Sequence, residues 1–167
     1  MSEVPYPMPI EVSAICFPLL GKYFFNSLID SIRNSQSSIY VIQYQFRWLV
    51  HMRNSLVQQL GSEIIKAKQR NVDIKIILHQ ESANRNLTKI NRFSSDMLIR
   101  AGCDVKLFRT NSFLHTKMWL IDCESTFIGS HNISTRSLCV NEEYSVKIVS
   151  KEFAKFSRTY FETLWRI

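Results

Sequence analysis

Two short runs of β-branched and aromatic residues lie on either side of an amphipathic segment in the first half of the chain. Residues 38–44 and 73–79 are apolar enough to form buried strands. Between them, residues 54–70 place apolar side chains on one side of a helix, with basic residues towards its C-terminal end. A strand, a helix and a second strand in this order predict an α/β fold.

The other segments extend this pattern. Apolar spacing predicts further helices at residues 22–34, 93–101 and 151–165, and further strands at residues 12–17, 105–109, 114–122, 126–129 and 143–150. Pro18 ends the first of these strands, and the polar stretch 80–90 is expected to be irregular. Alternating strands and helices followed by a cluster of strands predict a mixed β-sheet flanked by helices on both faces. Because no linker, repeat or low-complexity segment interrupts residues 1–167, we expect one domain.

The charge balance indicates the kind of partner. Lys and Arg number 21 against 14 Asp and Glu, so the net charge is +7. A globular domain this basic favours polyanionic partners such as nucleic acid or an anionic membrane surface. No apolar run is long enough to cross a membrane, and the N-terminal segment lacks the basic start of a secretory signal. We therefore expect a cytoplasmic protein without stable membrane association.

Residues 114–143 contain the groups needed for phosphoryl transfer. In the predicted strand 114–122, His115 and Lys117 share one face, because side chains two residues apart in a strand point the same way. A neutral imidazole can attack phosphorus, and a lysine can bind a phosphate oxygen. Ser130 and Asn132 follow the next predicted strand, and Glu143 begins another. Each residue taken alone is more often structural or solvated, whereas the fixed spacing of all five favours a catalytic site.

This spacing, HTK-x4-D-x6-GSHN, resembles the HKD motif of the phospholipase D superfamily, and the single copy and short chain resemble the small single-motif bacterial endonucleases of that superfamily. The resemblance implies that His115 forms a phosphohistidine and that Lys117 and Asn132 bind the non-bridging oxygens. Ser130 would hydrogen-bond in the same pocket, and Glu143, rather than its neighbour Glu142, would orient His115. Asp122 belongs to the signature, and we expect it to be structural, bonding local backbone or a nearby hydroxyl.

A single motif also predicts the quaternary structure. The reaction needs one histidine as nucleophile and another as general acid. Two chains would therefore pair across a two-fold axis with the active site at the interface. The same chemistry predicts no metal site and no cofactor.

The sequence favours a nonspecific endonuclease acting on DNA, with RNA also open, and leaves two alternatives: a phospholipid phosphodiesterase and a non-catalytic nucleic-acid-binding module. Arg85 and Lys89 in the polar stretch, with Arg47 and Arg53 after the second strand, are candidates for contacts with nucleic-acid phosphates. Residues 45–50, including Trp48, are open to three interpretations: a lipid-contacting loop, a base-stacking platform or part of a dimer interface.

Overall fold

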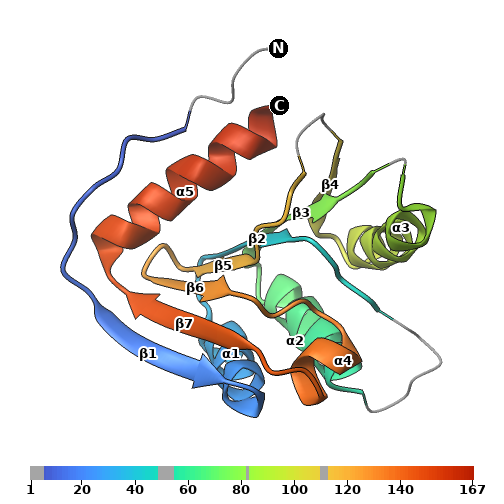
Figure 1. The fold of residues 1–167 in the computed structure, drawn as a ribbon, viewed down its shortest axis with the longest axis horizontal. Helices are drawn as coiled ribbons and strands as arrows, with labels where there is room; N and C mark the ends of the chain where they lie inside the picture. The colour runs from blue at the N-terminus through green and yellow to red at the C-terminus, as the bar shows by residue number, and fades with distance from the viewer. Residues whose placement is uncertain (1–5, 49–54, 82, 110–112) are drawn as a thin grey trace.

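A computed structural model describes residues 6–48, 55–81, 83–109 and 113–167. Within these residues the chain forms a seven-stranded sheet in the order β1-β7-β6-β5-β2-β3-β4 and five α-helices (Figure 1). The strands are Ile15–Leu20 (β1), Ser38–Gln43 (β2), Asp73–His79 (β3), Asp104–Phe108 (β4), Met118–Ile121 (β5), Ser125–Gly129 (β6) and Tyr144–Val149 (β7). The helices are Lys22–Asn34 (α1), Leu56–Gln69 (α2), Arg85–Arg100 (α3), Thr135–Cys139 (α4) and Lys151–Arg166 (α5).

The sheet is mixed, as predicted, and its strand directions decide which loops meet. Strands β2, β3 and β4 are parallel, whereas β5, β6, β7 and β1 pair antiparallel to one another and β5 pairs antiparallel to β2. The carboxyl ends of β1, β2, β3, β4 and β6 therefore lie at the same end of the sheet as the starts of β5 and β7. We call this the carboxyl end of the sheet; it is on the right in Figure 1.

Two apolar cores lie on opposite faces of the sheet and confirm that helices cover both. Along β5, Trp119 and Ile121 join the core that contains buried residues of α1 and α2, and Met118 and Leu120 join the core that contains those of α5. This alternation follows from the period of two along a strand. Figure 1 shows α5 on one side of the sheet and α1 and α2 on the other. No helix in the described residues is long and apolar enough to cross a membrane.

The α3 helix begins earlier than predicted. It starts at Arg85, where the Asn84 side chain accepts a hydrogen bond from the Leu87 amide, so the polar stretch 80–90 is largely helical. The polar composition hid this helix, and a polar residue directly after the stretch is buried for its hydrogen bonds. Asn91 is fully buried and bonds the Phe46 amide and the Tyr44 and His79 carbonyls at 2.8–2.9 Å. A hydrophobic periodicity cannot detect such a contact.

Two strands, β1 and β5, also differ from the predicted bounds by more than one residue. The strand expected at residues 12–17 runs from Ile15 to Leu20, and Pro18 lies within it, paired with Val146. It is an edge strand, where a residue without an amide proton can face away from the ladder. The strand expected at 114–122 is limited to Met118–Ile121, because residues 113–117 lie outside the sheet pairing. The short α4 was not predicted.

Asp122 is structural, as predicted, and lies at the opposite end of β5 from His115. Its carboxylate accepts hydrogen bonds at 2.8–3.2 Å from the Gln36, Ser37 and Ser38 amides and from the Ser37 hydroxyl. Partial burial raises the pKa of Asp122, but these hydrogen bonds together outweigh burial and leave the pKa below its ordinary value. The carboxylate thus fixes the turn between α1 and β2 to the end of β5.

We expect Asp122→Ala to lower the free energy of unfolding by about 2 kcal/mol, because three backbone amides lose a charged acceptor. Since the pKa of Asp122 is lowered in the folded state, this contribution is complete above the ordinary value of 3.8 and disappears as the pH falls below it. Urea unfolding of both proteins at pH 7 and pH 3 measures the difference. Asp96→Ala, on the exposed surface of α3, is the matched control. A variant as stable as the control at pH 7 would contradict the assignment.

Candidate active site

All five predicted site residues lie at the carboxyl end of the sheet. His115 and Lys117 immediately precede β5, Ser130 and Asn132 follow β6, and Glu143 immediately precedes β7. Because β5, β6 and β7 are consecutive neighbours, these three chain segments are adjacent. The fold therefore brings together residues that the sequence related only by spacing.

His115 and Lys117 differ in exposure, although they stand two residues apart. The His115 side chain is exposed, whereas Lys117 is 8% exposed and its Nζ donates to the His115 carbonyl oxygen at 2.7 Å. No acidic side chain in the described part of the chain forms an ion pair with Lys117. The ammonium is held by neutral groups, so its charge is available to an anion.

Tyr44 contacts both of these residues and was not anticipated from the sequence. Its ring centroid lies 4.8 Å from that of His115 in an edge-on arrangement, and 5.2 Å from the Lys117 Nζ. The second contact is a cation–π interaction, which stabilises the ammonium without neutralising it. Tyr44 directly follows β2, and the only sequence signal for its role is this position at the carboxyl end of a predicted strand.

A second histidine, His79, is buried against the rings of Tyr44 and Phe113. It is 1% exposed, its ring centroid is 5.3 Å from Tyr44 and 4.7 Å from Phe113, and its Nε2 is 2.9 Å from the Glu81 carboxylate. No sequence motif singles out His79, because it does not begin an HxK pattern. Because His79 is buried, it supports the rings of Tyr44 and Phe113 and does not face the solvent.

The surroundings of His115 favour its neutral form. Partial burial lowers the pKa of His115, and electrostatic interactions with Lys117 and His79 lower it further. A neutral imidazole retains the lone pair that a nucleophile needs. Burial also lowers the pKa of Lys117, and the negative charge of the Glu143 carboxylate offsets part of this lowering.

Glu143 is bound to neighbours other than the one predicted. Its carboxylate accepts hydrogen bonds from the Ser130 hydroxyl, the Ser137 hydroxyl at 2.8 Å and the Asn141 amide at 3.1 Å. Burial raises the pKa of Glu143, but these bonds outweigh it and keep the carboxylate ionised. Within the described residues of one chain it makes no hydrogen bond with His115, so the orientation of His115 by Glu143 stays a prediction.

The GSHN turn shows why each of its residues is present. A Cβ on Gly129 would lie 2.2 Å from the Ser145 Oγ, so only glycine allows β6 and β7 to approach this closely. His131 is fully buried, stacks on Phe24 at 4.1 Å and has its Nδ1 2.7 Å from the Ser145 hydroxyl, so it supports the turn. The Asn132 carboxamide makes no hydrogen bond to the described residues, and its Oδ1 is buried. The turn thus presents a free amide group.

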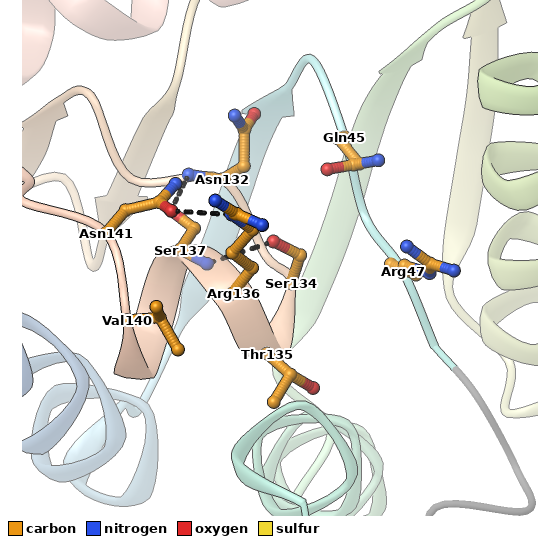
Figure 2. A pocket seen from close by; sticks show the side chains of 9 residues that line it. All are labelled: Gln45, Arg47, Asn132, Ser134, Thr135, Arg136, Ser137, Val140 and Asn141. Atoms are coloured by element: carbon orange, nitrogen blue, oxygen red, sulfur yellow. Dashed lines mark hydrogen bonds between the residues drawn. The ribbon is translucent and has the colours of Figure 1, made fainter.

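The predicted basic contacts divide into two groups. Arg85 and Lys89 are exposed on the first turns of α3, and no hydrogen bond or ion pair joins them to the other site residues within the described chain. Arg47, by contrast, lines a cleft of about 510 Å³ that also contains Asn132 (Figure 2). Arg53 lies outside the described residues.

The segment after β2 offers no exposed apolar loop in its described part. Phe46 is fully buried and Trp48 is 2% exposed, and both belong to the core shared with α1 and α2. The Trp48 indole lies against α2, where a Cβ on Gly61 would be 2.4 Å from it. Trp48 is therefore a core residue, and all three interpretations of it drawn from the sequence were wrong. Leu49 and Val50 lie outside the described residues.

The chemistry available at this end of the sheet is a nucleophile, a cation and neutral hydrogen-bond donors. Within the described ranges, no group of three or more His, Cys, Asp or Glu side chains is arranged to hold a metal ion.

Comparisons with known proteins identify relatives over almost the whole chain. A family profile described as "Cardiolipin synthase, PLD-like domain" matches residues 28–165. A protein named 5'-3' exonuclease PLD3 from Xenopus tropicalis is 24% identical over 178 residues, covering 99% of this chain and 34% of the relative. Cardiolipin synthase A from Pseudomonas fluorescens is 36% identical over 87 residues, covering 52% and 18%. The chain thus spans about a third or less of the length of these curated relatives.

The fold is also similar to a solved structure of comparable size. Nuc from Salmonella typhimurium, described as a phospholipase D family member, superposes with a TM-score of 0.74 at 16% identity. The superposition covers 91% of this chain and 95% of that one. At this identity the similarity concerns the fold, and it confirms the predicted α/β architecture.

We expect Tyr44→Ala to lower kcat by about 10- to 100-fold, because both His115 and Lys117 lose the ring that holds them. Tyr44→Phe keeps the ring and should remain within about threefold of the wild type. Since partial burial lowers the pKa of His115, Tyr44→Ala should also move the acid limb of kcat/KM to higher pH. Activity against pH for the three proteins measures both effects. An alanine variant with unchanged kcat and an unmoved acid limb would show that Tyr44 only fills space.

Proposed function

Since this chain belongs to the phospholipase D superfamily, with a family profile matching residues 28–165, we propose that it is a metal-independent endonuclease that hydrolyses DNA through a phosphohistidine on His115. The observation that carries this proposal is the convergence of His115, Lys117 and Asn132 at one end of the sheet. The exposed imidazole can reach a substrate, and the nearly buried ammonium has no acidic partner among the described residues.

The reaction follows from these groups in two steps. The His115 imidazole attacks phosphorus and forms an N–P bond, while the P–O bond to the leaving strand breaks and the leaving oxygen takes a proton from a general acid. A water molecule then attacks the phosphohistidine, gives its proton back to the same acid acting as base, and releases His115. Lys117 and the side-chain amide of Asn132 bind the non-bridging oxygens, where negative charge is greatest in both transition states.

We further propose that the general acid is His115 of the partner subunit. The motif occurs once in this sequence, and the pairing of two such chains supplies the second copy. His79 is a poor candidate for this role, because it is 1% exposed and its Nε2 faces Glu81. The active form is therefore a two-fold dimer with the two motifs facing each other.

Several observations favour nucleic acid over phospholipid. The net charge of +7 suits a polyanion, and Phe46 and Trp48, the aromatic residues of the suspected lipid loop, are in the core. One relative is named an exonuclease, which supports nucleic acid as the substrate class. Another is named cardiolipin synthase, so phospholipid hydrolysis is the second candidate function.

Incubation of circular plasmid and single-stranded DNA with the protein in excess EDTA should give cleavage, and His115→Ala should give none while still binding DNA. A circular substrate has no ends, so its cleavage separates endonuclease from exonuclease action. Vesicles containing phosphatidylglycerol and cardiolipin test the second candidate with the same two proteins. Lipid hydrolysis that depends on His115, with both DNA substrates intact, would replace the nuclease proposal.

The dimer should appear in light scattering as twice the mass of one chain, 19.6 kDa. Mixing His115→Ala with excess wild type and purifying the mixed dimer should give a species that turns over at most slowly, because each site needs both histidines. A fully active monomer would contradict the partner's role as general acid.

A further inference from the structure

We propose that the cleft beside Asn132 is a subsite for the phosphodiester next to the scissile one, so that the preferred substrate is a polynucleotide strand with at least two consecutive phosphates. This rests on the proposed function and names the substrate class that the site selects. The cleft has a volume of about 510 Å³ and is lined by Gln45, Arg47, Asn132, Ser134, Thr135, Arg136, Ser137, Val140 and Asn141.

Two guanidinium groups give the cleft its charge. Arg47 comes from the segment after β2 and Arg136 from α4, and both side chains are exposed. Figure 2 shows Arg47 on the segment after β2 and Arg136 on α4, with Asn132 and Ser134 on the segment that leads into α4. Neither forms an ion pair within the described part of the chain, whereas Arg33, Arg158 and Arg166 each face a carboxylate. Two unneutralised guanidiniums around one hollow are suited to a phosphate, which arginine binds with paired hydrogen bonds.

The backbone holds the two walls together. The Ile133 amide donates to the Gln45 carbonyl at 3.0 Å, and the Arg47 amide donates to the Ile133 carbonyl at 2.7 Å. These bonds join the segment after β2 to the segment after β6. Arg47 is thereby fixed next to the turn that carries Asn132, so the cleft is built into the fold rather than left to two independent side chains.

Further hydrogen bonds, between side chains, connect the cleft to Glu143, one of the proposed catalytic residues. The Arg136 Nε donates to the Asn141 Oδ1 at 3.1 Å, and the Asn141 Nδ2 donates to Glu143. The backbone amide of Asn132 donates to the Ser137 hydroxyl at 2.9 Å, and that hydroxyl donates to Glu143. The negative charge of Glu143 reduces the positive potential of the cleft. Through these hydrogen bonds Glu143 also orients Arg136 and Asn132. A strand whose scissile phosphate lies at Lys117 and Asn132 would continue into the cleft.

The character of the lining favours a sugar–phosphate strand over an acyl chain. Apart from Val140, the side chains are hydroxyls, amides and guanidiniums. Hydroxyl, amide and guanidinium groups make most protein contacts to phosphate and sugar. An acyl chain would meet only one wholly apolar side chain in this lining, that of Val140.

The test compares substrates with one and two charges. The protein is assayed on bis(p-nitrophenyl) phosphate, on the dinucleotide TpT, on TpTpT, and on TpTpT with either linkage replaced by a neutral methylphosphonate. We expect kcat/KM to rise at least about tenfold from TpT to TpTpT, and the rise to vanish with the methylphosphonate on one side. The double variant Arg47→Ala/Arg136→Ala should lose the rise, so its ratio of TpTpT to TpT activity falls to about one. Arg100→Ala, which removes an exposed arginine at the C-terminal end of α3, is the matched control.

Binding provides a readout independent of turnover. With His115→Ala as the parent, the affinity for a single-stranded 12-mer is measured by anisotropy at several salt concentrations. Loss of the contact with this one phosphate should reduce the slope of log K against log salt by about 0.7, the contribution of each neutralised phosphate on a single strand. An unchanged slope, or an equal loss of activity on TpT and TpTpT, would overturn the subsite. Absence of cleavage of every diester by the wild type would instead contradict the proposed function and leave the slope to judge the cleft.

Discussion

The antiparallel run β5–β6–β7 is the constraint on which the site depends. Because these strands reverse direction at each step, the start of β5, the end of β6 and the start of β7 all lie at one end of the sheet. The parallel strands β2 and β3 end there as well, which adds Tyr44 and His79 from behind. Gly129 lets β6 and β7 meet, since any Cβ there would collide with Ser145. A change in the register of these strands would separate the proposed nucleophile from the groups that bind its substrate.

The electrostatics at this end separate charges that elsewhere in the chain neutralise each other. Lys117 is held by a carbonyl oxygen and an aromatic ring, and the Glu143 carboxylate is occupied by two hydroxyls and an amide. Had the two paired directly, the lysine would be a weaker site for phosphate. Lys117 is thus left without an acidic partner among the described residues, and burial together with the charge of Lys117 lowers the pKa of His115. Both conditions favour attack of an imidazole on an anionic phosphodiester.

The sequence predicted what depends on periodicity and spacing, and missed what depends on individual contacts. The runs of apolar and β-branched residues predicted β2 to within one residue and β3 at its observed bounds, and the helical spacing predicted α1 at its observed bounds. The HKD spacing selected residues that the fold places at one end of the sheet, and their catalytic roles stay predictions. The structural role predicted for Asp122 is confirmed by its four hydrogen-bond donors. Asn91 was hidden because a buried polar residue on a helix looks like part of a loop. Tyr44 was hidden because its role comes from strand order, which no local pattern encodes.

Glu143 illustrates how a predicted residue can take a wider role than its motif implies. Through Ser137 it fixes the backbone amide of Asn132, and through Asn141 it orients the guanidinium of Arg136. Both of those residues line the cleft, so one carboxylate organises the groups that would receive two neighbouring phosphates. Its lowered pKa keeps it an acceptor for all three donors through neutral pH. Orientation of His115 across a two-fold interface would not require these bonds to break if a carboxylate lone pair remains free, because each oxygen can accept two hydrogen bonds. In that case Glu143 would couple the nucleophile His115 to Asn132, whose side chain would bind the scissile phosphate, and to Arg136, which would bind the neighbouring phosphate.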